Sequence, residues 1–516
     1  MKRREFIKTT AAAGAALGMA PVLKSWVPQH NWDGYDFGPG PEVKDRLYQG
    51  PIPSYNPEDY FGEEPEVVQY TMPGKQLLNC YGAGLMTYIS GDYGAPVVPG
   101  EKLETTIDKL ARYELGTKLY IRPNWRHIQK KAGRLDFDDY WKITLDKAAQ
   151  YGKRVGFRVM ISNPDTLEDA LPDFVLKKVP LDKLPGEWKG DPSQPRFQHE
   201  HFQPRYNDYL MGWYEEMMNL LADKYNGSEL IELVDTHHYG FWGEGHAWPY
   251  EGHNFKNRKE AEAKLLRMYE IQQKAWSKVP LCTNVQPDHS GVNNSEIVDR
   301  SMRDHNWLRR DTILVDTESI EQLANRPAWC AAFVECAMTR GPKPVLDKYG
   351  RPTGDNVIRH AMDVGANYYS LWSFHSICAE NLKSYYDAYP EMLDEIAGRI
   401  GYRVRPSFIW HGKDKEDLDF LVFGMQNDGI AGVPGVLRLT LFSEDGKVNI
   451  SGCLDAGYPD AGVRSAMMYL PEGTPWNNGY LRLKAEIEVK GQRYPVPFAC
   501  AEPLNPDGSL TIKPNR

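Results

Sequence analysis

The sequence lacks several short motifs that identify common classes of protein. Its seven cysteines include no C-x-x-C pair, so neither a zinc ribbon nor a thioredoxin-like redox centre is indicated. It has no glycine-rich loop of the P-loop or dinucleotide-binding type, and no convincing internal repeat. The formal net charge of −9 argues against a general attraction to nucleic acid or to an anionic membrane surface.

The cysteines are also too few and too scattered for a disulfide framework. Their number is odd, and several lie in apolar strand-like runs, where cysteine acts as a small hydrophobic residue. We therefore expect at most one or two disulfides. The seven are Cys80, Cys282, Cys330, Cys336, Cys378, Cys453 and Cys500.

The amino-acid composition is that of an ordinary globular protein with many aromatic residues. Hydrophobic residues make up 41% and charged residues 25%, which leaves no room for a largely disordered protein. Aromatic residues reach 12%, with 14 Trp and 30 Tyr. Flat rings cover the apolar C–H faces of sugars, but they also fill large cores, so composition alone favours neither role.

The N-terminus resembles a twin-arginine export signal. Lys2-Arg3-Arg4-Glu5-Phe6-Ile7-Lys8 has the paired arginines, the Phe, the aliphatic residue and the Lys of that signal, and it precedes a weakly apolar run. The run from Thr10 to Ala20 is too short for a permanent membrane helix, and no Cys follows it as a lipid anchor. We expect residues 1–24 to be a signal peptide, read by the twin-arginine machinery, and the mature protein to be periplasmic or extracellular without stable membrane insertion.

Three further regions are predicted after this signal. Residues 25–75 are rich in Pro, Gly and Asp and read as an extended lead-in. Residues 76–404 alternate short apolar runs with helical patterns, as βα units do, whereas residues 405–516 contain alternating β-rich segments separated by turns. We expect a (β/α)₈ barrel of the α/β class, followed by an antiparallel β-sandwich; a doubly wound open sheet is the alternative.

Eight strands and six helices can be assigned within the predicted barrel. The expected strands are Leu77–Tyr88, Lys118–Arg122, Arg154–Met160, Leu230–Thr236, Val279–Asn284, Thr312–Asp316, Trp329–Glu335 and Ala366–Trp372. The expected helices are Thr105–Tyr113, Tyr140–Tyr151, Asp208–Lys224, Lys259–Trp276, Ser295–Leu308 and Gly354–Val364. In such a barrel the active site lies at the C-terminal ends of the strands, so candidate residues are sought there.

Glu244 is the first candidate catalytic residue. It follows strand four between two glycines, with Trp242, His246 and Trp248 close by in the sequence. Glycines allow the backbone to turn tightly and approach a ligand. Apolar neighbours would raise the pKa of the Glu244 carboxyl by desolvation, as a general acid near neutral pH requires; the alternative is a helix-capping or Arg-paired glutamate.

A second carboxylate is needed to cleave a glycosidic bond. Glu335 ends the apolar run Ala332-Phe-Val and is the preferred candidate. Glu318, which follows the predicted strand six, is the main competitor, and Asp316 and Asp347 are weaker ones. A separation of about 5 to 5.5 Å between the two carboxyl groups would indicate retention of configuration, and about 6.5 to 9.5 Å inversion.

Other strand ends supply candidate contacts to a sugar. Asn side chains can donate to and accept from hydroxyl groups, and Arg can pair with a catalytic carboxylate or with an anionic sugar. For each such residue a structural role is the alternative. The candidates are Arg122, Asn124, Trp125, Arg158, His237, His238, Trp242, His246, Trp248, Asn284 and Trp372.

The histidines near strand four could instead bind a metal. His237, His238, His246 and His253 lie within one stretch, but H-E-x-x-H or another dedicated spacing is absent. Adjacent side chains on a strand point to opposite faces, which separates His237 from His238. We expect no metal and no cofactor, and we expect these histidines to bind a sugar hydroxyl or to orient Glu244.

Residues 125 to 155 resemble the start of clan A glycoside hydrolases. Trp125-Arg-His-Ile-Gln-Lys-Lys-Ala-Gly-Arg-Leu-Asp-Phe, then a helix, then Ala148-Ala-Gln-Tyr-Gly-Lys-Arg-Val is similar to bacterial β-galactosidases with a Trp before Glu-x-x-x-Gly-x-Tyr-Asp-Phe and a helix leading to Gly-x-x-Val. Those enzymes are retaining hydrolases with an acid/base Glu after strand four and a nucleophilic Glu after strand seven. The resemblance, over about residues 75 to 380, implies these roles for Glu244 and Glu335 and an aromatic residue, Trp372, after strand eight.

The sequence departs from that family at the acid/base position. The family's Glu normally follows Asn, whereas Gly243 precedes Glu244 here. The Trp-Gly-Glu-Gly-His stretch is instead similar to a set of little-characterised barrel proteins thought to be glycosidases. The resemblance implies a retaining, β-galactosidase-like hydrolase of an oligo- or polysaccharide, which we expect to be exo-acting and, from its N-terminal motif, exported. A non-catalytic polysaccharide-binding barrel and a metal-dependent hydrolase using the His237–His253 region are the alternatives, and Arg122, Arg158 and His246 leave an anionic sugar open.

Overall fold

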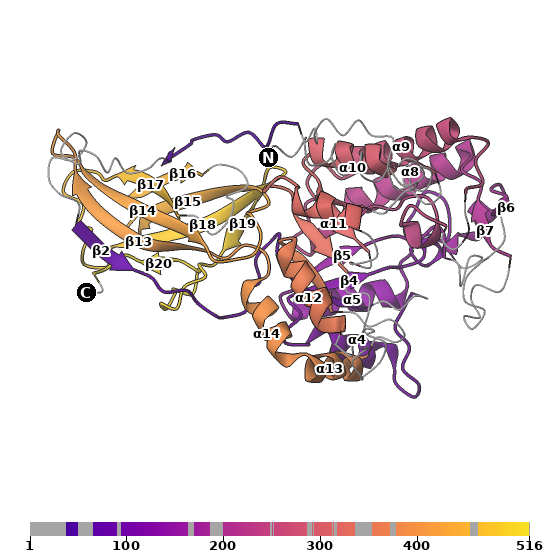
Figure 1. Cartoon of the computed structure of the whole chain (residues 1–516), viewed down its shortest axis with the longest axis horizontal. Coiled ribbons are helices and arrows are strands. Elements are labelled where there is room, and N and C mark those ends of the chain that lie inside the picture. The colour runs from indigo at the N-terminus through magenta and orange to yellow at the C-terminus, as the bar shows by residue number, and fades with distance from the viewer. Residues whose placement is uncertain are drawn as a thin grey trace, which may run out of the picture.

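Eight short parallel strands close into a barrel in the computed structural model of the chain (Figure 1). The closed order is β10-β11-β12-β3-β4-β5-β8-β9. The strands are β3 (Gly84–Tyr88), β4 (Lys118–Ile121), β5 (Arg154–Phe157), β8 (Ile231–Asp235), β9 (Leu281–Asn284), β10 (Trp307–Arg310), β11 (Ala332–Val334) and β12 (Tyr368–Leu371). The structure describes residues 38–49, 66–89, 94–163, 170–185, 200–247, 250, 252–285, 291–292, 294–311, 313, 317–335, 353–371, 378–454 and 463–514.

Helices cover the outside of the barrel, and several begin at the cap residues that their sequences offer. The side chains of Asp138, Asn207 and Asn257 accept hydrogen bonds from the first turns of α5, α8 and α9, respectively. The helices are α4 (Leu103–Ala111), α5 (Asp139–Gln150), α7 (Asp173–Leu176), α8 (Asp208–Tyr225), α9 (Arg258–Ala275), α10 (Asn294–Arg303), α11 (Thr317–Ala324), α12 (Thr353–Asp363), α13 (Ala379–Ala388) and α14 (Pro390–Arg399). A small hairpin of β6 (Leu181–Lys183) and β7 (Phe202–Pro204) lies between α7 and α8.

The predicted sixth strand was wrong by about one strand length. The sequence predicted Thr312–Asp316, whereas the barrel uses β10 (Trp307–Arg310), which pairs in parallel with β9 and β11. The predicted helix Ser295–Leu308 therefore ran into the strand, because α10 ends at Arg303. The reason is physical: β10 carries two arginines, and the charge of Arg309 is balanced by carboxylates from three other places in the chain.

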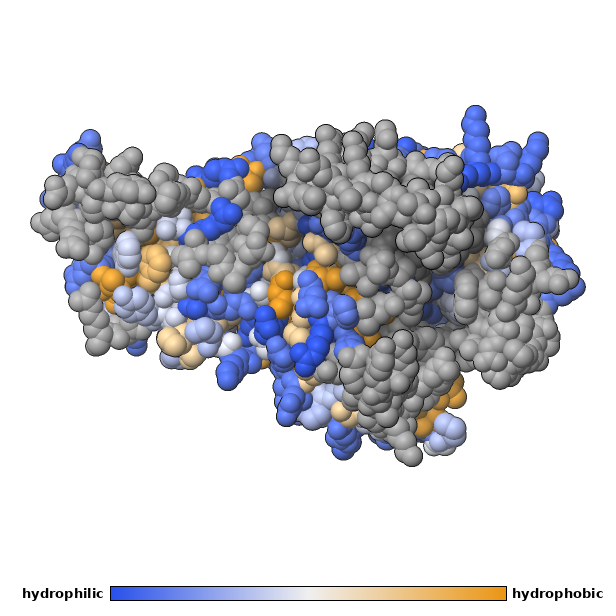
Figure 2. All heavy atoms as spheres, in the orientation of Figure 1, coloured by the Kyte–Doolittle hydropathy of each residue, from blue (hydrophilic) through white to orange (hydrophobic). Residues whose placement is uncertain are grey.

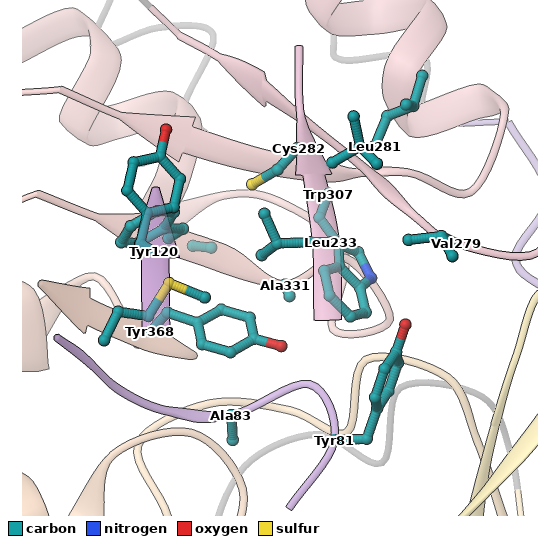
Figure 3. Packing of buried hydrophobic residues seen from close by; sticks show 14 of the residues in the cluster. Tyr81, Ala83, Tyr120, Leu233, Val279, Leu281, Cys282, Trp307, Ala331 and Tyr368 are labelled. Atoms are coloured by element: carbon teal, nitrogen blue, oxygen red, sulfur yellow. The ribbon is translucent and has the colours of Figure 1, made fainter. Parts of the chain in front are cut away.

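Aromatic rings and one ion pair fill the base of the barrel, where its strands begin. Trp307 lies 5.8 Å from Tyr81 and 5.9 Å from Tyr368, measured between ring centroids, and Figure 3 shows these rings together. The Lys118 ammonium lies 3.6 Å from the Glu232 carboxylate, and both side chains are fully buried. Such a filled interior places any substrate at the opposite end of the barrel.

The C-terminal domain is a β-sandwich, as the sequence predicted. One sheet has the order β1-β17-β14-β13-β2, and the other has the order β16-β15-β18-β19, with β20 beside β18. Inward-facing residues such as Phe423 and Leu439 join the two sheets in one core. The strands are β1 (Tyr48–Gln49), β2 (Glu66–Tyr70), β13 (Val404–Lys413), β14 (Asp419–Asn427), β15 (Val436–Ser443), β16 (Asn449–Cys453), β17 (Val463–Tyr469), β18 (Leu481–Val489), β19 (Gln492–Val496) and β20 (Leu510–Thr511).

The lead-in before the barrel belongs structurally to this sandwich. Its segments β1 and β2 pair antiparallel with β17 and β13 and form the two edges of one sheet. The sandwich packs against the base of the barrel, where the rings of Tyr81 and Tyr494 stack 3.7 Å apart beneath the Arg154 guanidinium. The first sheet is thus completed by residues that precede the barrel in the sequence.

The surface and the cysteines give little further indication of function. Hydrophilic side chains cover much of the described surface in Figure 2, with scattered hydrophobic patches. Within the described ranges, no helix combines the length and apolar character needed to cross a bilayer. The six cysteines in these ranges are all free thiols, and Cys336 lies outside them.

Candidate active site

Four carboxylates meet at the end of the barrel where the strands finish. Asp235 ends β8, Glu244 lies in the loop that follows it, Asp311 follows β10, and Glu335 follows β11. All four are 7% exposed or less. Buried carboxylates need positive partners, and three arginines supply them.

The arginines also come from strand ends. Arg122 follows β4, Arg158 follows β5, and Arg309 lies within β10. Burial alone would lower the pKa of the Arg122 guanidinium, but the charge of Glu335 and its other neighbours raise that pKa well above the ordinary value. The site therefore consists of fixed cations that alternate with fixed anions.

Arg122 joins the two predicted catalytic residues. Its Nη1 donates to Glu244 Oε1 at 3.5 Å, and its Nη2 donates to Glu335 Oε2 at 2.9 Å. The two guanidinium nitrogens are about 2.3 Å apart, so the two carboxylate oxygens lie within about 9 Å of each other. Both glutamates therefore contact the same guanidinium, each through a different nitrogen.

Glu335 is held by three donors. Besides Arg122, the Tyr88 hydroxyl donates to Glu335 Oε2 at 3.1 Å, and Arg309 Nη2 donates to the same oxygen. The backbone N–H of Glu335 donates to the Arg310 carbonyl, which fixes the residue beside β10. Charge-assisted donors of this kind stabilise an ionised carboxylate, as a nucleophile requires.

The backbone that carries Glu244 is a tight loop built from glycines. Gly240, Gly243 and Gly245 have φ values of 89°, 77° and 85°, and Trp242 between them has a φ of 52°. A Cβ atom at Gly243 would lie 2.2 Å from Nδ1 of His237, whose fully buried ring packs beneath the loop. This contact explains why the position before Glu244 is glycine, where the family the sequence resembles has asparagine.

Replacement of Gly243 by alanine tests that contact. We expect Gly243→Ala to destabilise the protein by about 1 to 3 kcal/mol, because the methyl group meets His237 and the backbone is left-handed. Thermal unfolding measures the loss. Gly133→Ala is the matched control, since Gly133 has a φ of 80° and no atom near its Cβ position. Equal losses in the two variants would show that His237 does not constrain the loop.

The charge state of Glu244 differs from the prediction made from its neighbours. Burial raises its pKa, as expected, but the hydrogen bond with His246 and the charges of Arg122 and Arg158 outweigh burial and lower the pKa to about 2. His246 Nε2 lies 3.2 Å from Glu244 Oε2, and Arg158 Nη1 lies 3.5 Å from Oε1. The expectation of a raised pKa was therefore wrong, because His246 and two arginines from other strands reach the carboxylate.

Asp311 is a site residue that the sequence analysis missed, as it also missed Asp235, Arg309 and Tyr88. Asp311 contacts all three arginines: Arg122 Nη2 at 3.3 Å, Arg158 Nη2 at 3.7 Å, and Arg309 Nη1. Its backbone N–H donates to Asn284 Oδ1 at 3.1 Å, and Asn284 Nδ2 donates to the Glu244 carbonyl at 3.0 Å. Asp311 directly follows β10, the sixth strand of the barrel. A correct prediction of that strand would therefore have identified Asp311 as an acidic residue at a strand end.

The competing candidates for the second carboxylate lie wholly or partly outside the described residues, so they stay predictions. Glu318 lies in α11, beyond the loop that follows β10, and its side chain is outside the described residues. Asp316 and Asp347 also lie outside them, as do the predicted sugar-contacting residues Trp248 and Trp372.

Most of the predicted sugar contacts within the described ranges are buried in the structure. Trp125 is fully buried, its indole N–H donates to Gln129 Oε1 at 2.8 Å, and its ring packs edge-on against Tyr214. It offers no surface to a sugar, so its prediction as a sugar contact was wrong. Asn124 is 1% exposed, and Asn284 orients the loops of Glu244 and Asp311. Trp242 remains half-buried beside His246.

The three histidines around Glu244 have different surroundings. Burial and the charge of Arg158 hold the pKa of His237 well below its ordinary value and lower that of His238 to about 4. The ring of His238 pairs with the Thr236 hydroxyl at 2.7 Å, whereas that of His246 pairs with Glu244. Among the described residues, no group of three or more His, Cys, Asp or Glu side chains is arranged to hold a metal ion.

Comparison with known proteins gives matches in structure only. No family model and no curated protein matches the sequence. The catalytic domain of a β-amylase from Paenibacillus polymyxa is 8% identical with a TM-score of 0.41, covering 60% of this chain and 98% of that one. A family 39 glycoside hydrolase from Bacteroides cellulosilyticus is 10% identical with a TM-score of 0.35, covering 77% and 82%. A β-galactosidase from Marinomonas ef1 is 11% identical with a TM-score of 0.36, covering 61% and 59%. At these values the matches assign no activity to this chain.

Proposed function

We propose that this chain is a glycoside hydrolase in which Glu335 is the nucleophile and Glu244 the acid/base. The observation that carries the proposal is the position of Arg122, which contacts both carboxylates at the mouth of the barrel. Cleavage of a glycosidic bond requires two carboxyl groups on either side of the bond. Glu244 and Glu335 come from β8 and β11, so a sugar ring between them would meet one on each side.

The first step replaces the glycosidic bond with a bond to the protein. Arg122, Arg309 and Tyr88 all contact Oε2 of Glu335 and orient its carboxylate, whose other oxygen attacks the anomeric carbon. The electron pair of the breaking C–O bond goes to the leaving oxygen, which takes the proton of Glu244. In the second step water attacks the same carbon, Glu244 accepts a proton from that water, and Glu335 is released as a carboxylate.

Glu244 must therefore gain a proton when the substrate is bound. Its contacts with Arg122 and Arg158 are long, both 3.5 Å, and burial acts on its pKa in the opposite direction. A sugar that enters between the side chains would separate Glu244 from the arginines and remove the remaining water. Both changes favour the neutral carboxyl group, so substrate binding itself would prepare the acid.

The finer assignments follow from the resemblance noted in the sequence. A retaining course, exo action and a β-galactoside-like substrate are properties of the family that residues 125 to 155 resemble. Export to the periplasm or the exterior follows from the N-terminal arginine motif. The upper bound of about 9 Å between the carboxylate oxygens is compatible with both retention and inversion, so retention rests on the resemblance.

The stereochemistry of the product tests the proposal. Purified protein should cleave at least one member of a panel of aryl glycosides and plant or algal oligosaccharides. Proton NMR in the first minutes should show a sugar with the substrate's anomeric configuration. The double variant Glu244→Gln/Glu335→Gln should be inactive, whereas the exposed Glu472→Gln should match the wild type.

Three outcomes would count against this proposal. An inverted product would remove the nucleophilic role of Glu335. Hydrolysis that persists in the double variant would remove both glutamates from the mechanism. Saturable binding of an oligosaccharide without any cleavage would favour the non-catalytic barrel instead.

A further inference from the structure

The arginines at the mouth of the barrel each contact three of the protein's own carboxylates. Arg122 contacts Glu244, Asp311 and Glu335. Arg158 contacts Asp235, Glu244 and Asp311. Arg309 contacts Asp235, Asp311 and Glu335. Each guanidinium therefore already has three anionic partners.

Asp311 is the centre of this network. Asp235, Glu244 and Glu335 each contact two of the arginines, whereas Asp311 contacts all three. Its side chain is 3% exposed, and its Oδ2 has no hydrogen-bond partner among the described residues. It therefore neutralises arginine charge that would otherwise be directed at the substrate.

The carboxylates of this site leave no arginine charge unbalanced. Three arginines face four carboxylates, so this described part of the site carries a formal charge of −1 while Glu244 is ionised and of zero once Glu244 is protonated. A substrate anion would have to displace a carboxylate from an arginine or remain unpaired among buried negative groups. A unit charge about 6 Å away, at an effective dielectric constant of about 20, changes affinity by about 100-fold.

We infer that the site accepts a neutral glycosyl ring and rejects a uronate or sulfated one, and that Asp311 sets this preference. The inference rests on the proposed function, whose substrate class it specifies. It also answers a question that the sequence left open, because Arg122 and Arg158 each keep two carboxylate partners besides Glu244 and are therefore not free to bind an anionic sugar.

Matched glycosides test the inference. Nitrophenyl β-galactoside and β-glucoside differ from the corresponding galacturonide and glucuronide only in a hydroxymethyl group in place of a carboxylate. Wild-type kcat/KM should be at least about 100-fold higher for the neutral member of the cleaved pair. A uronide cleaved within about tenfold of its neutral partner would overturn the inference and leave the proposed function intact.

Two variants of Asp311 separate its charge from its structural role. Asp311→Asn removes the excess negative charge and should lower the preference for the neutral glycoside by about tenfold or more, whatever the overall loss of activity. Asp311→Glu keeps the charge and should retain the wild-type preference. If Asp311→Asn leaves the preference unchanged, or fails to fold while the wild type accepts the uronide, Asp311 does not set it.

Binding of simple anions gives a measurement that does not depend on cleavage. Calorimetry with sulfate and with glucuronate at millimolar concentration should detect no binding to the wild type and measurable binding to Asp311→Asn. If the wild type binds either anion and the Arg122→Met variant does not, the inference is overturned. If no glycoside is cleaved, the proposed function fails, and this titration still decides whether the site accepts anions.

Discussion

Replacement of Glu335 by glutamine is expected to lower kcat by at least about 10⁴-fold, the largest effect of any single change in the chain. Glutamine keeps the size of the side chain but has no negative charge with which to attack the anomeric carbon. It also leaves Arg122 and Arg309 without one of their anionic partners. The loss should be similar for good and poor leaving groups, because formation of the covalent intermediate is blocked in both cases.

The measurement is steady-state hydrolysis of the best substrate, with two controls. Thermal unfolding of Glu335→Gln shows whether the variant is folded, since loss of a buried charge partner also destabilises a protein. Binding of the intact substrate to the folded variant should persist, so the loss appears in kcat more than in KM. A folded Glu335→Gln with activity within a few-fold of the wild type would assign the nucleophile to another residue, and Asp311 would be the first alternative because it shares two arginines with Glu335.

The barrel was largely predictable because seven of its strands are short runs of mainly apolar residues between helical patterns. Val155 and Phe157 of β5, for example, are buried without any charge that needs compensation. β10 differs because Arg309 is stabilised not only by the nearby Asp311 but also by Asp235 and Glu335, which lie far before and after it in the sequence. A local pattern contains no information about such distant partners, so an apolar run a few residues later was preferred.

The sandwich shows a second limit of local patterns. Its long strands could be recognised, because β18 alternates buried and half-buried residues and β14 is a long run of mostly buried, largely apolar residues. The edge strands β1 and β2 could not, because they are short and precede the barrel in the sequence. Their pairing with β17 and β13 depends on a sheet formed by residues hundreds of positions later.

The sequence allowed the two glutamates of the candidate site to be predicted, but not the charged groups that surround them. Glu244 and Glu335 follow apolar strands, so their position at the barrel mouth could be inferred from order alone. The arginines that reach Glu244 come from β4 and β5, and their contact with it depends on the closed barrel. The aromatic neighbours in the sequence suggested a raised pKa, whereas the neighbours in space lower it.

Replacement of Glu244 by glutamine is expected to have the second largest effect on activity, and the size of the loss should depend on the leaving group. Glu244→Gln should reduce kcat/KM by about 10² to 10⁴-fold for oligosaccharides, whose leaving oxygen needs a proton. The loss should be much smaller for dinitrophenyl glycosides, whose leaving group departs as a stable anion. A loss of the same size for both substrates would show that Glu244 does not donate the proton.

The pH dependence of wild-type activity also tests whether Glu244 donates the proton. In the free protein Glu244 is mostly ionised above a pKa of about 2, so its acidic form becomes rarer as pH rises. The value of kcat/KM, which reports the free protein, should therefore fall toward high pH earlier than kcat, which reports the complex where the arginine contacts are broken. This fall of kcat/KM toward high pH, the alkaline limb of the profile, should be absent in Glu244→Gln. His246→Phe, which removes a hydrogen bond that lowers the pKa of Glu244, should move the limb of kcat/KM to higher pH. A limb that stays in place in both variants would belong to a different group.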